Sequence, residues 1–179
     1  QFIHEKTGFT SDQVKFAYCP ERVLPGNIFH ELVNNDRVIG GLTLDATNQA
    51  RNIYKKICNG DLHVTNAKTA EMVKLTENSY RDINIAFANE ISIICDEINI
   101  DVNELIKLSN QHPRVNILNP GCGVGGHCIA IDPWFIASQF PDITPLIQQA
   151  RRVNLKKTQW TINKIKKIAK SFYNKNGKP

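Results

Sequence analysis

The segment of this sequence that is best suited to chemistry is a glycine-rich stretch that ends in a histidine and a cysteine. It reads Pro-Gly-Cys-Gly-Val-Gly-Gly-His-Cys over residues 120–128, which ends on Cys128. Backbone N–H groups of such a loop can stabilise an anion, and thiolate is the reactive form of cysteine. Asp132 follows four residues later, so both side chains could face one pocket if the loop enters a helical turn. These residue types would suit a nucleophilic thiolate.

Three other interpretations of this segment remain open from the residues alone. Residues 121–126 match the dinucleotide-binding pattern G-x-G-x-x-G, but that pattern should follow a strand and be followed by an acidic residue about twenty positions on. Cys122, His127 and Cys128 could ligate a metal, although adjacent ligands rarely share one ion and no fourth ligand has zinc-like spacing. A free cysteine in a structural loop is otherwise most often a small, inert hydrophobe.

The composition limits the classes of protein to consider. With 179 residues, 41% of them hydrophobic and 22% charged, the chain has the composition of an ordinary globular protein. Five scattered cysteines without an export signal predict free thiols and a cytoplasmic location. No stretch is apolar over the length of a membrane span. The chain starts with Gln1 and its only methionine is Met72, which predicts an excised piece of a longer protein.

The C-terminal part of the sequence is strongly basic. Residues 151–179 contain ten Lys or Arg and no Asp or Glu, in a chain whose formal net charge is +5. Such a tail can bind nucleic acid. Its lysines, however, alternate with apolar residues at helical spacing, and no nucleic-acid motif accompanies them. We therefore expect a solvated helix face and no nucleic-acid partner.

The elements that would position the cysteine begin with α/β structure. Strands are predicted at 14–18, 37–41 and 62–64, and a helix is predicted over 45–58 because turn residues bound each segment. After them the sequence becomes helical, with no glycine or proline over residues 61–111.

A helix of about 30 residues is predicted from a cap at Asn66 or Thr69. Its apolar residues fall on two opposite sides, which predicts burial on both sides and therefore a helical interface between subunits. A shorter helix, capped by Asp101 or Asn103, should end at Asn110. We then expect a loop up to Pro133, a short helix after that proline, and a long last helix over 144–173.

Six segments carry a resemblance to a known family. They are residues 18–26 (YCPERVLPG), 35–41 (NDRVIGG), 71–78 (EMVKLTEN), 89–90 (NE), 112–117 (HPRVNI) and 125–133 (GGHCIAIDP). In this order they resemble the central region of the UDP-glucose/GDP-mannose dehydrogenase family, over most of the chain from Phe16 to about Val153. Segments 18–26, 35–41 and 112–117 fit the branch of that family that oxidises UDP-N-acetyl-D-mannosamine.

The resemblance implies a four-electron oxidation of the C6 hydroxyl of a UDP-sugar to a carboxylate, with two NAD⁺ per turnover, in surface polysaccharide biosynthesis. The family proceeds through a thiohemiacetal and a thioester, because a thiol can both capture an aldehyde and leave an acyl group. Cys128 matches the nucleophile. Lys74 and Asn78 match the residues that stabilise negative charge on the reacting oxygen.

The remaining site residues also follow from the resemblance. Asp132 matches an aspartate that positions or activates water, and Glu21 matches an acid–base group for thioester hydrolysis. Arg114 matches an arginine that reaches the substrate, in relatives from the neighbouring subunit. Gly125 and Gly126 match substrate-binding positions. No metal is implied.

The sequence departs from the UDP-glucose branch at two positions and from the general pattern at a third. Pro25 stands where that branch has a second glutamate, and His127 stands where it has serine. Both residues fit a branch that acts on N-acetylated sugars, so UDP-N-acetylglucosamine and UDP-glucose are kept as alternative substrates. Cys122 stands where proline is expected and could be a bystander thiol.

The predicted fold is therefore mainly α. Residues 1–65 would be the α/β tail end of a Rossmann NAD-binding domain, 66–143 a central helical catalytic and dimerisation domain with one very long helix, and 144–179 a connector helix toward a UDP-binding domain. The long helix with two apolar sides predicts a homodimer through that helix. Because the main NAD site would be absent, we expect this piece alone to be inactive. A non-catalytic helical dimerisation module remains the alternative.

Overall fold

A computed structural model describes residues 2–10, 13–24 and 26–176, and divides the chain into two compact units, residues 1–74 and 75–179. The strands are β1 (Ala17–Tyr18), β2 (Arg37–Gly41) and β3 (Leu62–Asn66). The helices are α1 (Phe2–Thr7), α2 (Ile28–Asn34), α3 (Leu44–Tyr54), α4 (Ala67–Glu97), α5 (Val102–Ser109), α6 (Cys128–Gln139), the 3-10 turn η1 (Pro141–Ile143) and α7 (Pro145–Asn176). None of the helices in these ranges is long and apolar enough to cross a membrane.

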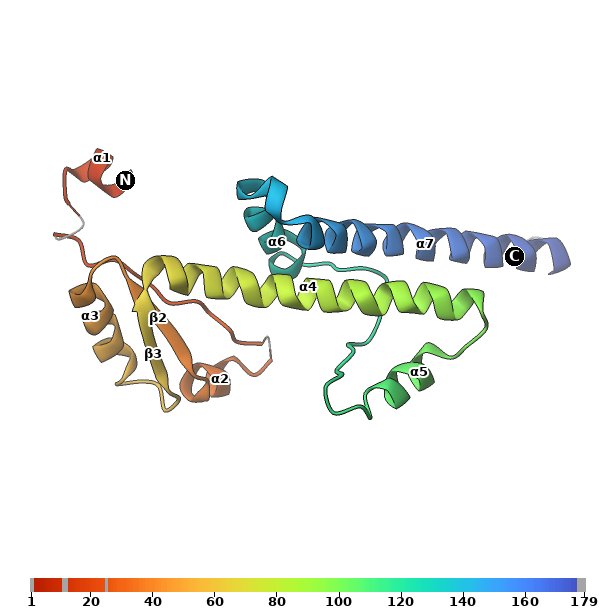
Figure 1. Ribbon diagram of the computed structural model, residues 1–179, viewed down its shortest axis with the longest axis horizontal. Coiled ribbons are helices and arrows are strands. Elements are labelled where there is room, and N and C mark those ends of the chain that lie inside the picture. The colour runs from red at the N-terminus through yellow and green to blue at the C-terminus, as the bar shows by residue number, and fades with distance from the viewer. Residues whose placement is uncertain (1, 11–12, 25, 177–179) are drawn as a thin grey trace. The chain divides into compact units, whose positions relative to one another are not determined.

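The first unit is built on a small sheet in the order β1-β2-β3 (Figure 1). β2 and β3 are parallel and are connected by α3, whereas β1 pairs antiparallel with β2. The strand predicted over 37–41 is confirmed, and all its residues are buried. The strand predicted over 14–18 is wrong except at its last two residues, because only Ala17 and Tyr18 have partners on β2.

Two side-chain caps fix how the helices of this unit begin. The Thr43 side chain accepts a hydrogen bond from the amide of Ala46 at the start of α3. The Asn66 side chain accepts from the amide of Thr69 at 2.8 Å, so Asn66 caps α4 as predicted. β2 runs close under this start, since a Cβ on Gly40 would lie 2.3 Å from the Asn66 carbonyl oxygen. Gly40 therefore allows the strand and the helix start to pack together.

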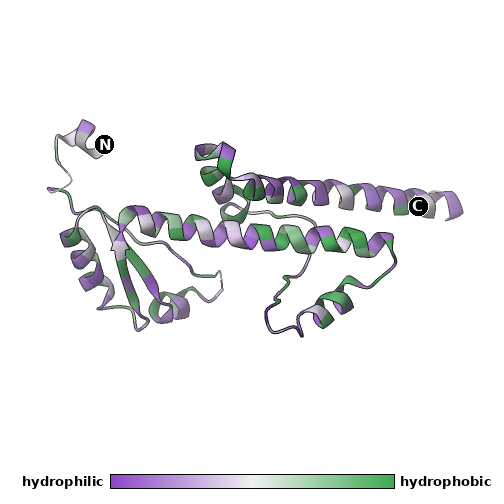
Figure 2. Ribbon diagram, in the orientation of Figure 1, coloured by the Kyte–Doolittle hydropathy of each residue, from purple (hydrophilic) through white to green (hydrophobic). Residues whose placement is uncertain are grey.

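The second unit consists of the longer part of α4 together with α5, α6 and α7 (Figure 1). α4 has 31 residues, as its lack of glycine and proline predicts. α5 is capped by Asp101, whose side chain accepts from the Asn103 amide, and ends at Asn110 as expected. α7 runs from Pro145 and is largely hydrophilic along its length (Figure 2).

The interior between α4 and α7 is polar. Arg151 Nη1 donates to Asp82 Oδ1 at 2.6 Å, with both side chains almost completely buried. Lys157 Nζ donates to Ser92 Oγ at 2.7 Å and lies 4.0 Å from the centre of the Trp160 ring. The prediction of a solvated basic face is therefore wrong for Arg151 and Lys157. Their acidic, hydroxyl and aromatic partners compensate for the loss of water.

Only one side of α4 is buried within a single chain. Ala86, Ala88 and Cys95 are buried, but Phe87 and Ile98 on the opposite side are 52% and 56% exposed. The buried side is not simply apolar, because it also carries Asp82, Asn89 and Ser92. The apolar side with Phe87 and Ile98 has no cover in the part of the chain that the structure describes.

Candidate active site

Cys128 is the first residue of α6 and is exposed. The helix expected after Pro133 thus begins five residues earlier, and the proline lies inside it. A proline there removes the amide that would bond the carbonyl of Ile129. The buried residues of α6, Pro133, Ile136 and Ala137, provide the packing that keeps this turn helical.

The early start of α6 places Cys128 and Asp132 one turn apart on the same side of the helix. Asn78 Nδ2, from α4, donates to Asp132 Oδ2 at 2.5 Å. Asn78 is buried. Asp132 therefore lies inside α6 and does not cap it, and Asn78 does not lie on an exposed helix face. Asn78 instead fixes the carboxylate that stands next to the cysteine.

Cys128 lies at the N-terminal end of α6. The first amides of a helix have no intrahelical acceptor, and the N-terminal end of the helix dipole is positive. His127, at the N-cap, makes no side-chain capping bond. Gly125 and Gly126 immediately precede it and are exposed, and Gly126 has a φ of 78°, which a residue with a Cβ would adopt only with strain. The backbone next to Cys128 is therefore accessible to a ligand.

In the first unit, the structure brings Lys74 to Glu21. Lys74 Nζ donates to the main-chain oxygen of Glu21 at 2.8 Å. The Glu21 carboxylate accepts from the amides of Arg22 and Val23, at 2.8 and 3.2 Å, and lies 3.4 Å from Arg37 Nη1. Partial burial favours the neutral acid, but these amides and the Arg37 charge outweigh it and lower the pKa of Glu21. Glu21 is held as a carboxylate, which suits a base.

Arg37 is the residue that sequence reasoning missed in this cluster. It is buried, donates from Nη2 to the carbonyl of Leu32 at 2.9 Å, and stacks on the Tyr54 ring at 4.9 Å. An arginine that opens an otherwise apolar strand was the available signal, because a buried cation needs a partner. Among the described residues, that partner includes Glu21.

The other predicted residues are less constrained. Arg114 is exposed in the segment between α5 and α6, and its guanidinium has no hydrogen bond or ion pair within the described ranges. Pro25 lies outside the described residues. Cys122 is exposed. Within the described residues, no group of three or more His, Cys, Asp or Glu could hold a metal ion.

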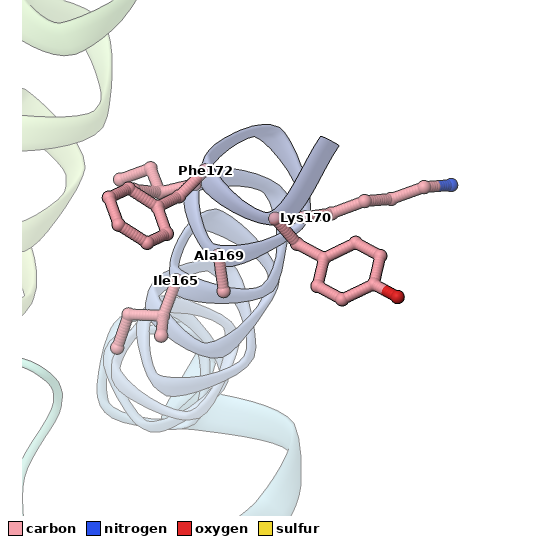
Figure 3. Close-up of a pocket in the computed structure, with 6 residues that line it drawn as sticks. Ile165, Ala169, Lys170 and Phe172 are labelled. Atoms are coloured by element: carbon pink, nitrogen blue, oxygen red, sulfur yellow. The ribbon is translucent and has the colours of Figure 1, made fainter. Parts of the chain in front are cut away.

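The dinucleotide-fingerprint interpretation of residues 121–126 lacks its strand. A helix does follow the glycines, but residues 110–127 contain no strand. A hollow on α7 is lined by Ile165, Ile168, Ala169, Lys170, Phe172 and Tyr173. Ile165 and Phe172 point to one side of the helix, away from Lys170 (Figure 3). None of the site residues predicted from the sequence contributes to it.

Both units match one protein family. The central-domain model of the UDP-glucose/GDP-mannose dehydrogenase family matches residues 68–156, and the family's NAD-binding-domain model matches residues 1–58. The chain therefore belongs to the UDP-glucose/GDP-mannose dehydrogenase family. The resemblance inferred from the six segments is confirmed, as is the mainly α fold that follows an α/β part.

Two curated relatives are similar to almost the whole chain. A UDP-N-acetyl-D-mannosamine dehydrogenase of Campylobacter jejuni is 60% identical over 96% of this chain and 42% of its own length. An NDP-N-acetyl-D-galactosaminuronic acid dehydrogenase of Ralstonia nicotianae is 54% identical over 96% of this chain and 40% of its own length. The chain thus spans about two fifths of the curated relatives that it matches.

Solved structures agree with these sequence matches. A UDP-D-ManNAc dehydrogenase from Pyrococcus horikoshii has a TM-score of 0.87 and 42% identity, over 99% of this chain and 42% of that one. The UDP-N-acetyl-mannosamine dehydrogenase Cap5O from Staphylococcus aureus has a TM-score of 0.82 and 46% identity, over 94% and 41%.

Proposed function

We propose that this chain is the nucleophile-bearing part of an NAD-dependent UDP-sugar 6-dehydrogenase that acts on UDP-N-acetyl-D-mannosamine. The single observation that carries the proposal is Cys128 at the exposed start of α6, with Asp132 one turn away and held by Asn78. The names of the relatives at about 60% identity support the sugar. We place the enzyme in the cytoplasm, in the biosynthesis of surface polysaccharide.

The proposed chemistry assigns each residue a task. The thiolate of Cys128 forms a bond to C6 of the aldehyde, and the same sulfur leaves when water attacks the thioester. Lys74 and Asn78 donate to the negative oxygen on C6. Asp132 and Glu21, both carboxylates, orient that water and take its proton. Arg114, Gly125 and Gly126 bind the sugar nucleotide.

One strand-to-helix turn of the first unit has no room for the pyrophosphate of NAD. The turn between β2 and α3 is filled, because the Gly41 amide bonds Thr47 Oγ1 at 2.9 Å and a Cβ on Gly41 would lie 2.5 Å from the Thr47 nitrogen. In the relatives, more than half of the length lies outside the matched part, and we place the pyrophosphate site there. NAD would supply the two hydride-accepting steps, at two NAD⁺ per turnover.

We also propose that the chain forms a homodimer through α4. The uncovered apolar side of the helix, with Phe87, Ile94 and Ile98 each about half exposed, supports this. A monomeric mass of the whole protein in light scattering would contradict it.

Assay of the whole protein with a panel of UDP-sugars tests the function. UDP-N-acetyl-D-mannosamine should give NADH, and Cys128→Ser should abolish uronate formation. Cys122→Ser, at the other exposed thiol of the same segment, is the matched control and should retain turnover. This chain alone should give no turnover. If Cys128→Ser forms uronate at the normal rate, Cys128 is not the nucleophile.

A specific observation supports a second candidate function. The Ralstonia relative is named for an N-acetyl-D-galactosaminuronic acid, at 54% identity. A higher kcat/KM for UDP-N-acetylgalactosamine than for UDP-N-acetyl-D-mannosamine would favour this second function. The same panel includes UDP-N-acetylglucosamine and UDP-glucose.

A further inference from the structure

Three buried side chains connect the glycine-rich segment to the ion pair between α4 and α7. Asn89 Oδ1 accepts from the Gly121 amide at 2.8 Å, and Asn89 Nδ2 donates to Asn154 Oδ1 at 2.8 Å. Asn154 Nδ2 donates in turn to Asp82 Oδ1 at 2.7 Å. Asp82 and Asn89 are 0% exposed and Asn154 is 1% exposed, so water does not compete for these bonds.

This chain of hydrogen bonds has a fixed direction. At one end the Gly121 N–H donates to Asn89, and at the other end Asp82 accepts from Asn154 Nδ2 with both its Oδ1 and its main-chain oxygen. Each amide between them therefore has one satisfactory orientation. Arg151, which donates to Asp82 at 2.6 Å, balances the charge at the accepting end.

The segment is held at a second point two residues later. Gly123 has a φ of 129°, and a Cβ there would lie 2.2 Å from Thr158 Oγ1 and 3.1 Å from the Asn154 carbonyl oxygen. The segment thus lies directly on the backbone of α7. Five residues after Gly123 the chain enters α6 at Cys128.

We propose that Asn89 and Asn154 are positioning residues for Cys128. They hold the glycine-rich segment in one register against α4 and α7, and this register determines where the first residue of α6 presents its sulfur. The proposal rests on the proposed function. A misplacement of about 1 Å at a reacting group can cost about 100-fold in rate.

The test uses the whole protein with its sugar nucleotide and NAD⁺. Asn89→Asp has the same shape but cannot donate to Asn154, so it should lower kcat about 100-fold with KM within about threefold.

A second pair of variants tests the bond from the Gly121 amide to Asn89 without changing the buried side chains. Gly121→Pro deletes the donating N–H, whereas Gly121→Ala keeps it and places its Cβ in ordinary contact, 3.7 Å from the Gly123 carbonyl oxygen. Proline should lower kcat much more than alanine, with little difference between the melting temperatures of the two variants. This pair decides the question if Asn89→Asp fails to fold.

The outcomes separate this proposal from the proposed function. Positioning is overturned if Gly121→Pro and Gly121→Ala have equal kcat, or if Asn89→Asp keeps the normal kcat, while Cys128→Ser is inactive. Full uronate formation by Cys128→Ser would instead remove the function on which the proposal rests.

Discussion

The two halves of α7 have similar basic compositions and different surroundings. In the first half, Arg151 and Lys157 are 3% and 6% exposed and have partners on α4. In the second half, Lys166, Lys167 and Lys170 are exposed, as are the apolar residues between them. The comparison shows that the basic composition of a helix does not determine how exposed its side chains are. Their exposure depends on whether the neighbouring helix offers complementary groups.

The largest expected effect is at the buried ion pair. Arg151→Ala leaves Asp82 as an uncompensated carboxylate and should cost about 3–5 kcal/mol in the free energy of unfolding. Arg152→Ala, at the exposed neighbour, should change it by less than about 0.5 kcal/mol. Urea unfolding followed by circular dichroism measures both. If both variants lost the same unfolding free energy, burial of the cation would not explain its contribution to stability.

A smaller effect is expected at Lys157. Burial lowers the pKa of Lys157, although the nearby Cys122 raises it in part. Lys157→Ala removes a charged hydrogen bond to Ser92 and a contact with Trp160, and should cost about 2 kcal/mol. Lys156→Ala, at the exposed neighbour, is the matched control and should cost less than about 0.5 kcal/mol. A cost at Lys156 as large as at Lys157 would contradict the structure.

Substitutions in the exposed half of α7 should change the free energy of unfolding very little. Ile165→Ser and Ile168→Ser, both at side chains about 60% exposed, should each change the unfolding free energy of this chain by less than about 0.5 kcal/mol. Thermal unfolding of the isolated chain is the measurement. A loss above about 2 kcal/mol would mean that a cover exists over this half.

The smallest effect concerns Glu21, an exposed carboxylate that contrasts with buried Asp82. Its pKa is lowered from 4.5, so any stability that it contributes is present above pH 4.5 and is lost as the pH falls through the lowered value. NMR titration of the carboxyl carbon should give a midpoint below 4.5. Arg37→Gln should move the midpoint upward, and an unchanged midpoint would remove Arg37 as a cause.

The sequence predicted local structure where local signals were sufficient. The caps at Asn66 and Asp101 mark helix starts because their side chains bond amides two or three residues away. The start of α6 was predicted wrongly because Pro133 suggested a first turn. Packing of Pro133, Ile136 and Ala137 extends the helix back to Cys128 in spite of the proline.

Interactions between residues far apart in the sequence were harder to predict from the sequence. Arg151 pairs with Asp82 across 69 residues, and Asn89 pairs with Asn154 across 65. Periodicity gives the face of a helix on which a residue lies but does not give its partner. The candidate nucleophile and its helpers came from the family resemblance, and the residues that fix the glycine-rich segment came only from the structure.

The contact between Gly123 and Thr158 has an evolutionary consequence. The space that a side chain at position 123 would need is already occupied by the Thr158 hydroxyl and the Asn154 carbonyl, and a smaller residue at 158 would relieve only the first obstruction. The φ of 129° remains a barrier to any L-residue. As long as this backbone path is kept, substitutions on α7 cannot make room for another residue at position 123, and glycine should persist there.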